Sequence, residues 1–204
     1  MARGLFEMRR MEALSNTIFG VAMTLLAYNL PKPTGLTATP DWNELARAYA
    51  PHIVPLMLSF IIAGVFWFSH QRRLAIAPQA GRGVVFLNLL FLLSIIVLPA
   101  TNGLYITYQS SSVVAVLYGL HLTVIALLNA VLWLIATAGQ RSWSVVAPAM
   151  FPVVVFMIGT AVAMVAPTGA LYVWNAAFIA PLIGHFGRRA AATSASRAAG
   201  TTDA

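Results

Sequence analysis

Few side chains in this chain of 204 residues could take part in chemistry, and those that could lie far apart. The sequence contains no cysteine, which excludes disulfides, thiol catalysis and cysteine-ligated metal sites. No two of its four histidines stand at the spacing of a metal-binding pair on a helix, and no serine has the setting of a catalytic nucleophile. The sequence therefore does not predict an enzyme, and we expect no cofactor.

The most informative polar side chains lie in the first apolar segment, residues 11–30. At about 100° per residue, one face of this segment mixes hydroxyls with apolar side chains. That face carries Leu14, Thr17, Ile18, Val21, Thr24, Leu25 and Tyr28, while Glu12, Asn16 and Met23 fall opposite. Polar atoms on both sides of a membrane helix must be satisfied by protein or water, which predicts a place at the centre of an assembly. The alternative is an ordinary buried helix whose Thr24 hydroxyl bonds to the Gly20 carbonyl.

The composition indicates that membrane-spanning helices carry these residues. The chain is 60% apolar and only 8% charged, whereas globular chains are about 25% charged. A window of about 20 residues, the length that crosses roughly 30 Å of hydrocarbon, finds six candidate spans. They run from about Met11 to Leu30, Ala50 to Ser69, Val84 to Leu104, Val113 to Ala136, Val145 to Val165 and Leu171 to Phe186. We expect an all-α integral membrane protein, with a six-helix domain over 1–186 and a disordered basic tail over 187–204.

The loops predict the orientation of these spans. Lysine and arginine are retained on the cytoplasmic side, and a cytoplasmic N-terminus puts ten basic residues inside and only Lys32 and Arg47 outside. Both termini are therefore predicted to be cytoplasmic. Lys32 and Arg47 share the longest loop, 31–49, which is expected to form a short amphipathic helix, and Pro51 and Pro55 are expected near the start of the second span. The net charge of +7 is spread in small clusters between long uncharged stretches, so no nucleic-acid partner is expected.

Three motifs occur in order along the first three expected spans. Residues 10–16 read Arg-Met-Glu-Ala-Leu-Ser-Asn, and residues 18–26 read Ile-Phe-Gly-Val-Ala-Met-Thr-Leu-Leu. Residues 66–73 read Phe-Trp-Phe-Ser-His-Gln-Arg-Arg, and residues 87–93 read Leu-Asn-Leu-Leu-Phe-Leu-Leu. They resemble the first-helix signature Arg-x-x-x-Phe-Ser-Asp with its Thr-Leu-Leu ending, the Trp-x-x-His-x-Arg motif and the third helix of the transmembrane protein 175 family. This family comprises the endolysosomal potassium channel and its bacterial homologues.

The resemblance implies a homotetramer of six-helix subunits in the bacterial inner membrane, with four copies of the first helix lining a central pore. The implied function is a potassium-selective or weakly selective cation channel without a carbonyl filter, whose partners are the lipid bilayer and monovalent cations. Its selectivity is attributed to an apolar constriction and a threonine ring, which match Val21, Thr24, Leu25 and Tyr28 here. A signature-motif network is implied to brace the first helix, and its residues are Arg10, Ser15, Asn16, Trp67 and His70.

The sequence departs from the family pattern at two signature positions. Leu14 stands where the family has phenylalanine, and Asn16 stands where it has aspartate. An asparagine side chain donates and accepts hydrogen bonds, but it offers Arg10 or a protonated His70 no counter-charge. We therefore expect assembly to be retained, and gating, pH response or conductance to differ.

The remaining polar residues of the spans have structural explanations, and two other functions stay open. Asn88 and Asn129 are expected to tie helices together, and the arginines at the cytoplasmic boundary to meet anionic lipid: Arg72, Arg73, Arg188 and Arg189. A secondary transporter would need inverted repeats and an ionisable group at mid-membrane, whereas all five acidic residues lie at or beyond the span ends. A non-conducting membrane scaffold is the other alternative, favoured if loss of the signature carboxylate has disabled the pore.

Overall fold

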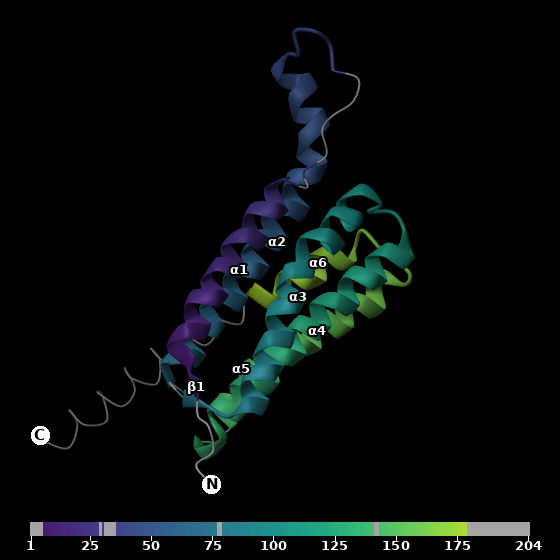
Figure 1. Ribbon diagram of the computed structural model, residues 1–204. Helices are drawn as coiled ribbons and strands as arrows, with labels where there is room; N and C mark the ends of the chain where they lie inside the picture. The colour runs from purple at the N-terminus through teal and green to yellow at the C-terminus, as the bar shows by residue number, and fades with distance from the viewer. Residues whose placement is uncertain (1–5, 29, 31–35, 77–78, 141–142, 179–204) are drawn as a thin grey trace, which may run out of the picture.

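The computed structural model describes residues 6–28, 30, 36–76, 79–140 and 143–178. Within these ranges the chain folds into an elongated bundle of helices (Figure 1). The helices are α1 (Met8–Tyr28), α2 (Trp42–Ile76), α3 (Arg82–Thr107), α4 (Ser112–Ala136), α5 (Trp143–Ala163) and α6 (Ala170–Asn175). Short 3-10 turns follow α4 at Ala138–Gln140 and α6 at Ala176–Phe178. Two-residue strands, β1 (Phe6–Glu7) and β2 (Gln79–Ala80), pair antiparallel and tie the start of α1 to the α2–α3 connection.

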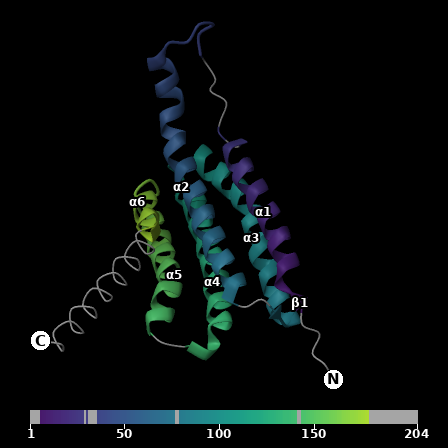
Figure 2. The ribbon, with the colours of Figure 1, turned by 90° about the vertical axis from the view of Figure 1, so that its left-hand side faces the viewer.

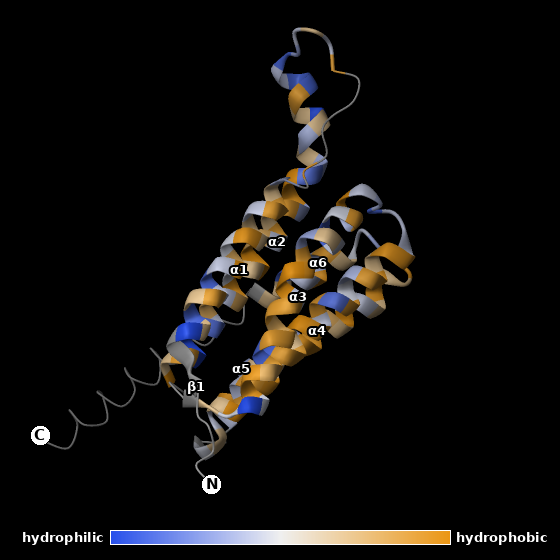
Figure 3. Ribbon diagram, in the orientation of Figure 1, coloured by the Kyte–Doolittle hydropathy of each residue, from blue (hydrophilic) through white to orange (hydrophobic). Residues whose placement is uncertain are grey.

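Helix α1 occupies one edge of the bundle, where it packs against α2 and α3, and α5 with α6 forms the opposite edge (Figure 2). Figure 3 shows α3, α4 and α5 as largely hydrophobic, whereas α1 alternates between hydrophobic and hydrophilic residues along its length. Among the long helices of the described bundle, α1 thus combines polar residues along its length with a position at the periphery.

Four helical segments are long and apolar enough to cross a membrane, and they correspond to the second to fifth predicted spans. These are α2, α3, α4 and Val145–Ala163 of α5. Helix α1 has 21 residues, enough to cross, but polar residues such as Glu12 and Asn16 lower its hydropathy. The structure describes the expected sixth span only as far as Phe178, and the predicted tail, 187–204, lies outside the described residues. The count of six spans and the domain limits of 1–186 therefore stay predictions.

Helix α2 begins earlier than the sequence predicts, because hydrogen bonds organise the chain before it. Asp41 Oδ1 accepts the backbone N–H of Glu44 at 2.7 Å. The Glu44 carboxylate in turn accepts the backbone N–H and the hydroxyl of Thr37, each at 2.8 Å. The Thr37 donors favour the charged form and hold the pKa of Glu44, which lies beyond the predicted span, below its ordinary value. The amphipathic helix expected within 31–49 is wrong as a separate element, since it is the first part of α2.

The two prolines expected near the start of the second span lie inside α2 instead. Pro55 has no N–H, so the carbonyl of Pro51 receives no donor from residue 55 of its own helix. Gln109 Nε2, in the turn between α3 and α4, donates to that carbonyl at 3.2 Å. This bond places Pro51 beside the α3–α4 turn. Residues 42–50, the α2 extension, therefore project beyond the bundle by about 13 Å of helix (Figures 1 and 2).

Aromatic packing closes the other edge of the bundle. Tyr105 and Tyr118 stack with ring centroids 5.0 Å apart, and Trp174 of α6 meets both edge to face. Gly119 and Gly159 make room for the indole, because a Cβ at Gly119 would lie 2.9 Å from Trp174 and one at Gly159 would overlap it. The two glycines thus allow the short helix α6 to pack against α4 and α5.

Candidate functional site

The two faces of α1 have different environments. Ser15, Phe19, Ala22 and Leu26 recur at helical spacing and are 0–2% exposed, so they form the face that packs into the bundle. At about 100° per residue, the direction opposite to this buried face falls within about 20° of Thr17 and Thr24. Both threonines are exposed. The two hydroxyls therefore point away from the core of the bundle.

The structure places all four candidate constriction residues on the exposed side of α1. Val21 is 54% exposed, Leu25 41% and Tyr28 79%, and all three lie to one side of Thr24 around the helix, at about 40–100°. Ile18, which the sequence pattern puts on the same stripe, is half-buried at its margin. The four residues thus share a face that no described part of this chain covers.

The hydroxyls on this face are bonded to their own helix. Thr17 Oγ1 donates to the Ala13 carbonyl at 3.1 Å, and Thr24 Oγ1 donates to the Gly20 carbonyl at 2.8 Å. The bond that the sequence offered as the alternative explanation of Thr24 is therefore present, but Thr24 is exposed and not buried. Because each hydroxyl hydrogen is used locally, each oxygen keeps acceptor capacity for a partner outside the helix.

Asn16 ties the N-terminal half of α1 to α2. Its side-chain oxygen accepts the indole N–H of Trp67 at 2.9 Å and a second hydrogen bond from Gln71 Nε2. Ser15 is buried and donates to the Met11 carbonyl at 2.6 Å, within its own helix. Of the five residues of the expected network, the recorded hydrogen bonds therefore join Asn16 and Trp67 directly. Gln71, which sequence reasoning missed, follows Trp67 by one helical turn, and that spacing was available as a signal.

His70 belongs to a different cluster, deeper in the bundle. Its ring is fully buried between Phe19 and Phe91, at centroid distances of 6.0 and 5.7 Å, and its Nδ1 contacts the guanidinium of Arg73. These two rings, Phe91 stacked and Phe19 tilted, leave His70 without access to solvent. Among the described residues, the structure records no hydrogen bond from Arg10 to this cluster or to Asn16, although Arg10 is exposed on the same helix.

Arg73 is the centre of this cluster. The guanidinium donates to Asn88 Oδ1 at 2.7 Å and to Asn129 Oδ1 at 3.4 Å, and it lies 5.5 Å from the ring centroid of Phe91. Its side chain is 4% exposed, so the expectation that Arg73 meets lipid is wrong. The two asparagines stabilise the buried charge, because their side-chain oxygens replace the water that an interfacial arginine would keep. This agrees with the expectation that Asn88 and Asn129 tie helices together.

The neighbouring Arg72 differs from Arg73 in its exposure. It is exposed, and its guanidinium lies 5.9 Å from the ring of Phe68 and 5.7 Å from that of Trp133. The two adjacent arginines therefore point about 100° apart around α2, Arg73 toward the core and Arg72 toward the surroundings.

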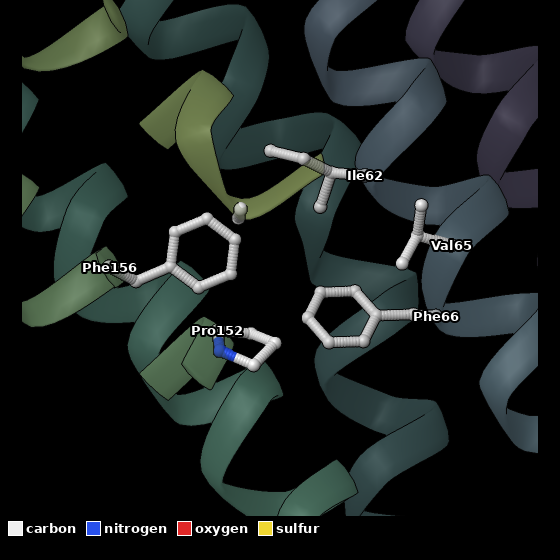
Figure 4. Close-up of a pocket in the computed structure, with 6 residues that line it drawn as sticks. Ile62, Val65, Phe66, Pro152 and Phe156 are labelled. Atoms are coloured by element: carbon white, nitrogen blue, oxygen red, sulfur yellow. The ribbon is translucent and has the colours of Figure 1, made fainter. Parts of the chain in front are cut away.

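Neither a metal centre nor a polar pocket emerges from the part of the chain that the structure describes. No group of three or more His, Asp and Glu side chains within the described ranges could hold a metal ion. A small pocket between α2, α5 and the turn after α6 is shown in Figure 4. It is lined by Ile62, Val65, Phe66, Pro152, Phe156 and Ala177. These side chains are all apolar, so the pocket offers no group that would orient a polar ligand.

Comparisons with known proteins agree with the motifs of the first three helices. Residues 10–99 match the family model described as the endosomal/lysosomal potassium channel TMEM175. A potassium channel from Streptomyces collinus is 28% identical over 131 residues, which cover 62% of this chain and 63% of that protein. The match thus spans somewhat less than two thirds of the curated relative.

The fold has a counterpart among solved structures. The crystal structure of a lysosomal potassium-selective channel TMEM175 homologue from Chamaesiphon minutus superposes with a TM-score of 0.73. The superposition covers 86% of this chain and 96% of that one, at 20% sequence identity, and shows a common fold. Together the comparisons confirm the resemblance to this family, and the apolar helices agree with a location in a membrane.

Proposed function

We propose that this chain, a relative of the transmembrane protein 175 potassium channels, assembles as a homotetramer whose four α1 helices line a cation pore. The proposal places it in the bacterial inner membrane with both termini in the cytoplasm, as the distribution of basic residues predicts. The permeant ion is potassium, with a modest or stronger preference over sodium, and no cofactor takes part.

One observation carries this proposal: the outward face of α1 is exposed, yet it is too polar to be a typical lipid-facing surface. This face presents two threonine hydroxyls and Tyr28 at the edge of the bundle. The other face of α1 is packed against the bundle. Hydroxyl oxygens with unused acceptor capacity gain nothing from hydrocarbon, whereas they do gain from water or a cation. A peripheral helix can meet its symmetry mates, so four such faces can enclose a common axis.

The residues of this face suggest how selection would work. An apolar ring passes an ion only if part of its hydration shell is shed, and potassium gives up water more readily than sodium. A ring of Thr24 oxygens would replace some of the lost water, while a ring of Val21 or Leu25 would close the pore by dewetting. Tyr28, at the outer end, is bulkier and more polar than the leucine usual in the family and would border the entrance.

The contacts of Asn16 with Trp67 and Gln71 give α1 a fixed attachment to α2. In the proposed channel these residues are positioning residues, because they hold the angle of α1 about its own axis. Rotation of α1 would move Thr24 and Val21 away from the pore axis together.

The experiment that tests the proposal is the reversal potential of purified protein in planar bilayers under a potassium/sodium bi-ionic gradient. Discrete currents that reverse toward the potassium potential support it. Thr24→Ala should then lower the potassium preference and Val21→Ala should increase leak. Arg72→Gln, on the exposed face of α2, should change neither the preference nor the leak. Saturable, slow uptake without discrete currents would favour a transporter, and silence from a verified tetramer would favour a scaffold.

A further inference from the structure

We infer that Thr17 forms a second ring of cation-binding hydroxyl oxygens in the pore, on the opposite side of Val21 from Thr24. The inference rests on the proposed function, in which α1 lines the pore. It assigns a binding site for a partly dehydrated monovalent cation to a residue outside the proposed constriction.

The first argument is direction. Thr17 and Thr24 are seven residues apart, which is two helical turns within about 20°, or about 10 Å along the axis. Both lie almost diametrically opposite the buried side chains of Ser15 and Phe19. Any symmetric arrangement that turns Thr24 toward a central axis therefore turns Thr17 toward it as well.

The second argument is the chemistry of the two hydroxyls, which is the same. Each donates its hydrogen to the carbonyl four residues earlier, Thr17 at 3.1 Å and Thr24 at 2.8 Å. A hydroxyl fixed in this way presents an oxygen lone pair outward, and an oxygen lone pair is what a potassium ion requires in exchange for water. Four copies would supply four such oxygens at the level of Thr17.

The third argument is the position of Val21 between them. Val21 is four residues from Thr17 and three from Thr24, about 6 Å and 4.5 Å along the helix, and it is 54% exposed on the same side. The apolar ring is thus flanked by a hydroxyl ring on each side. An ion that sheds water to pass Val21 meets replacement oxygens before and after the ring, from either direction.

The inference predicts a directional signature. With a cytoplasmic N-terminus, Thr17 is the first ring for ions that leave the cell. The isosteric variant Thr17→Val should reduce outward single-channel potassium current by about threefold or more, and inward current less. Thr24→Val should reduce inward current more. Thr17→Ser, which keeps the hydroxyl, should retain the parent currents.

The control is Thr107→Val, because Thr107 is also exposed and also donates to a carbonyl four residues earlier, that of Gly103 at 2.9 Å. It lies at the end of α3 and should leave both currents unchanged. Size-exclusion chromatography of each purified variant verifies that the assembly is intact before currents are compared.

Crystals soaked in thallous ions, which replace potassium and scatter anomalously, give a reading that does not depend on current. The parent protein should show density on the axis at the levels of Thr17 and Thr24, and Thr17→Val should lose only the first. A second site at Thr17 is overturned if Thr24→Val alters the currents while Thr17→Val does not, or if Thr17→Ser behaves as Thr17→Val. If neither threonine matters and no axial ion is seen, the proposed function itself is wrong.

Discussion

Replacing Asn88 by leucine tests how the buried charge of Arg73 is held inside the bundle. Asn88 Oδ1 lies 2.7 Å from the guanidinium, and the two side chains are 0% and 4% exposed. The other recorded oxygen partner, Asn129 Oδ1, is at 3.4 Å, so Asn88 is the principal acceptor. A hydrogen bond to a charged group contributes about 1.5–3 kcal/mol, and leucine removes the acceptor without leaving a cavity. We expect the free energy of unfolding to fall by about 2 kcal/mol.

Asn88→Asp is the complementary change at the same position. It keeps the acceptor and adds a counter-charge, whereas the recorded partners of Arg73 in the described part of the chain include no carboxylate. Because the guanidinium is already buried, a neighbouring carboxylate offsets an existing cost. We expect the aspartate variant to be at least as stable as the parent.

The assay is unfolding by sodium dodecyl sulfate in mixed micelles, followed by tryptophan fluorescence. Arg72→Gln is the matched control, because Arg72 is exposed and its removal should cost less than about 1 kcal/mol. A leucine variant as stable as the parent would show that Asn88 does not hold the charge. An aspartate variant as unstable as the leucine variant would refute the argument that the cluster lacks a counter-ion.

Three further predictions concern other parts of the molecule. Gly159→Ala should destabilise the bundle by about 1–3 kcal/mol, measured in the same unfolding assay, because the added methyl overlaps Trp174. Asn16→Asp should change channel currents at some pH by placing a carboxylate beside two existing donors; currents identical at every pH tested would contradict this. The pKa of Glu44 is lowered by Thr37, so the stabilisation of the α2 start is present above the ordinary pKa and is lost as the pH falls through the folded value. Glu44→Gln should abolish that dependence, read as hydrogen exchange at residues 41–47.

The sequence predicted the apolar helices well because their signal is local. Length and hydropathy alone locate α3, α4 and most of α5. Helical spacing also grouped Val21 and Thr24 on one stripe, and the structure exposes both, but the buried face that carries Ser15 and Phe19 was not predicted from the sequence.

Other features depend on partners that are distant in the chain, and the sequence could not provide them. The burial of Arg73 requires oxygens from Asn88 on α3 and Asn129 on α4, so its place beside Arg72 suggested an interfacial role for both arginines. The continuation of α2 through Pro55 likewise involves a donor supplied by Gln109 from the α3–α4 turn. In both cases a side chain from another part of the chain supplies a hydrogen bond that the local sequence does not reveal.

The bond from Gln109 to the Pro51 carbonyl has a mechanical consequence for α2. Because Pro51 and Pro55 have no N–H, this stretch lacks backbone hydrogen bonds of its own helix and forms a weak joint in α2. The side chain of Gln109 fastens that joint to the corner between α3 and α4. A force applied to the α2 extension is therefore transmitted along α2 and also, through Gln109, to the turn between α3 and α4.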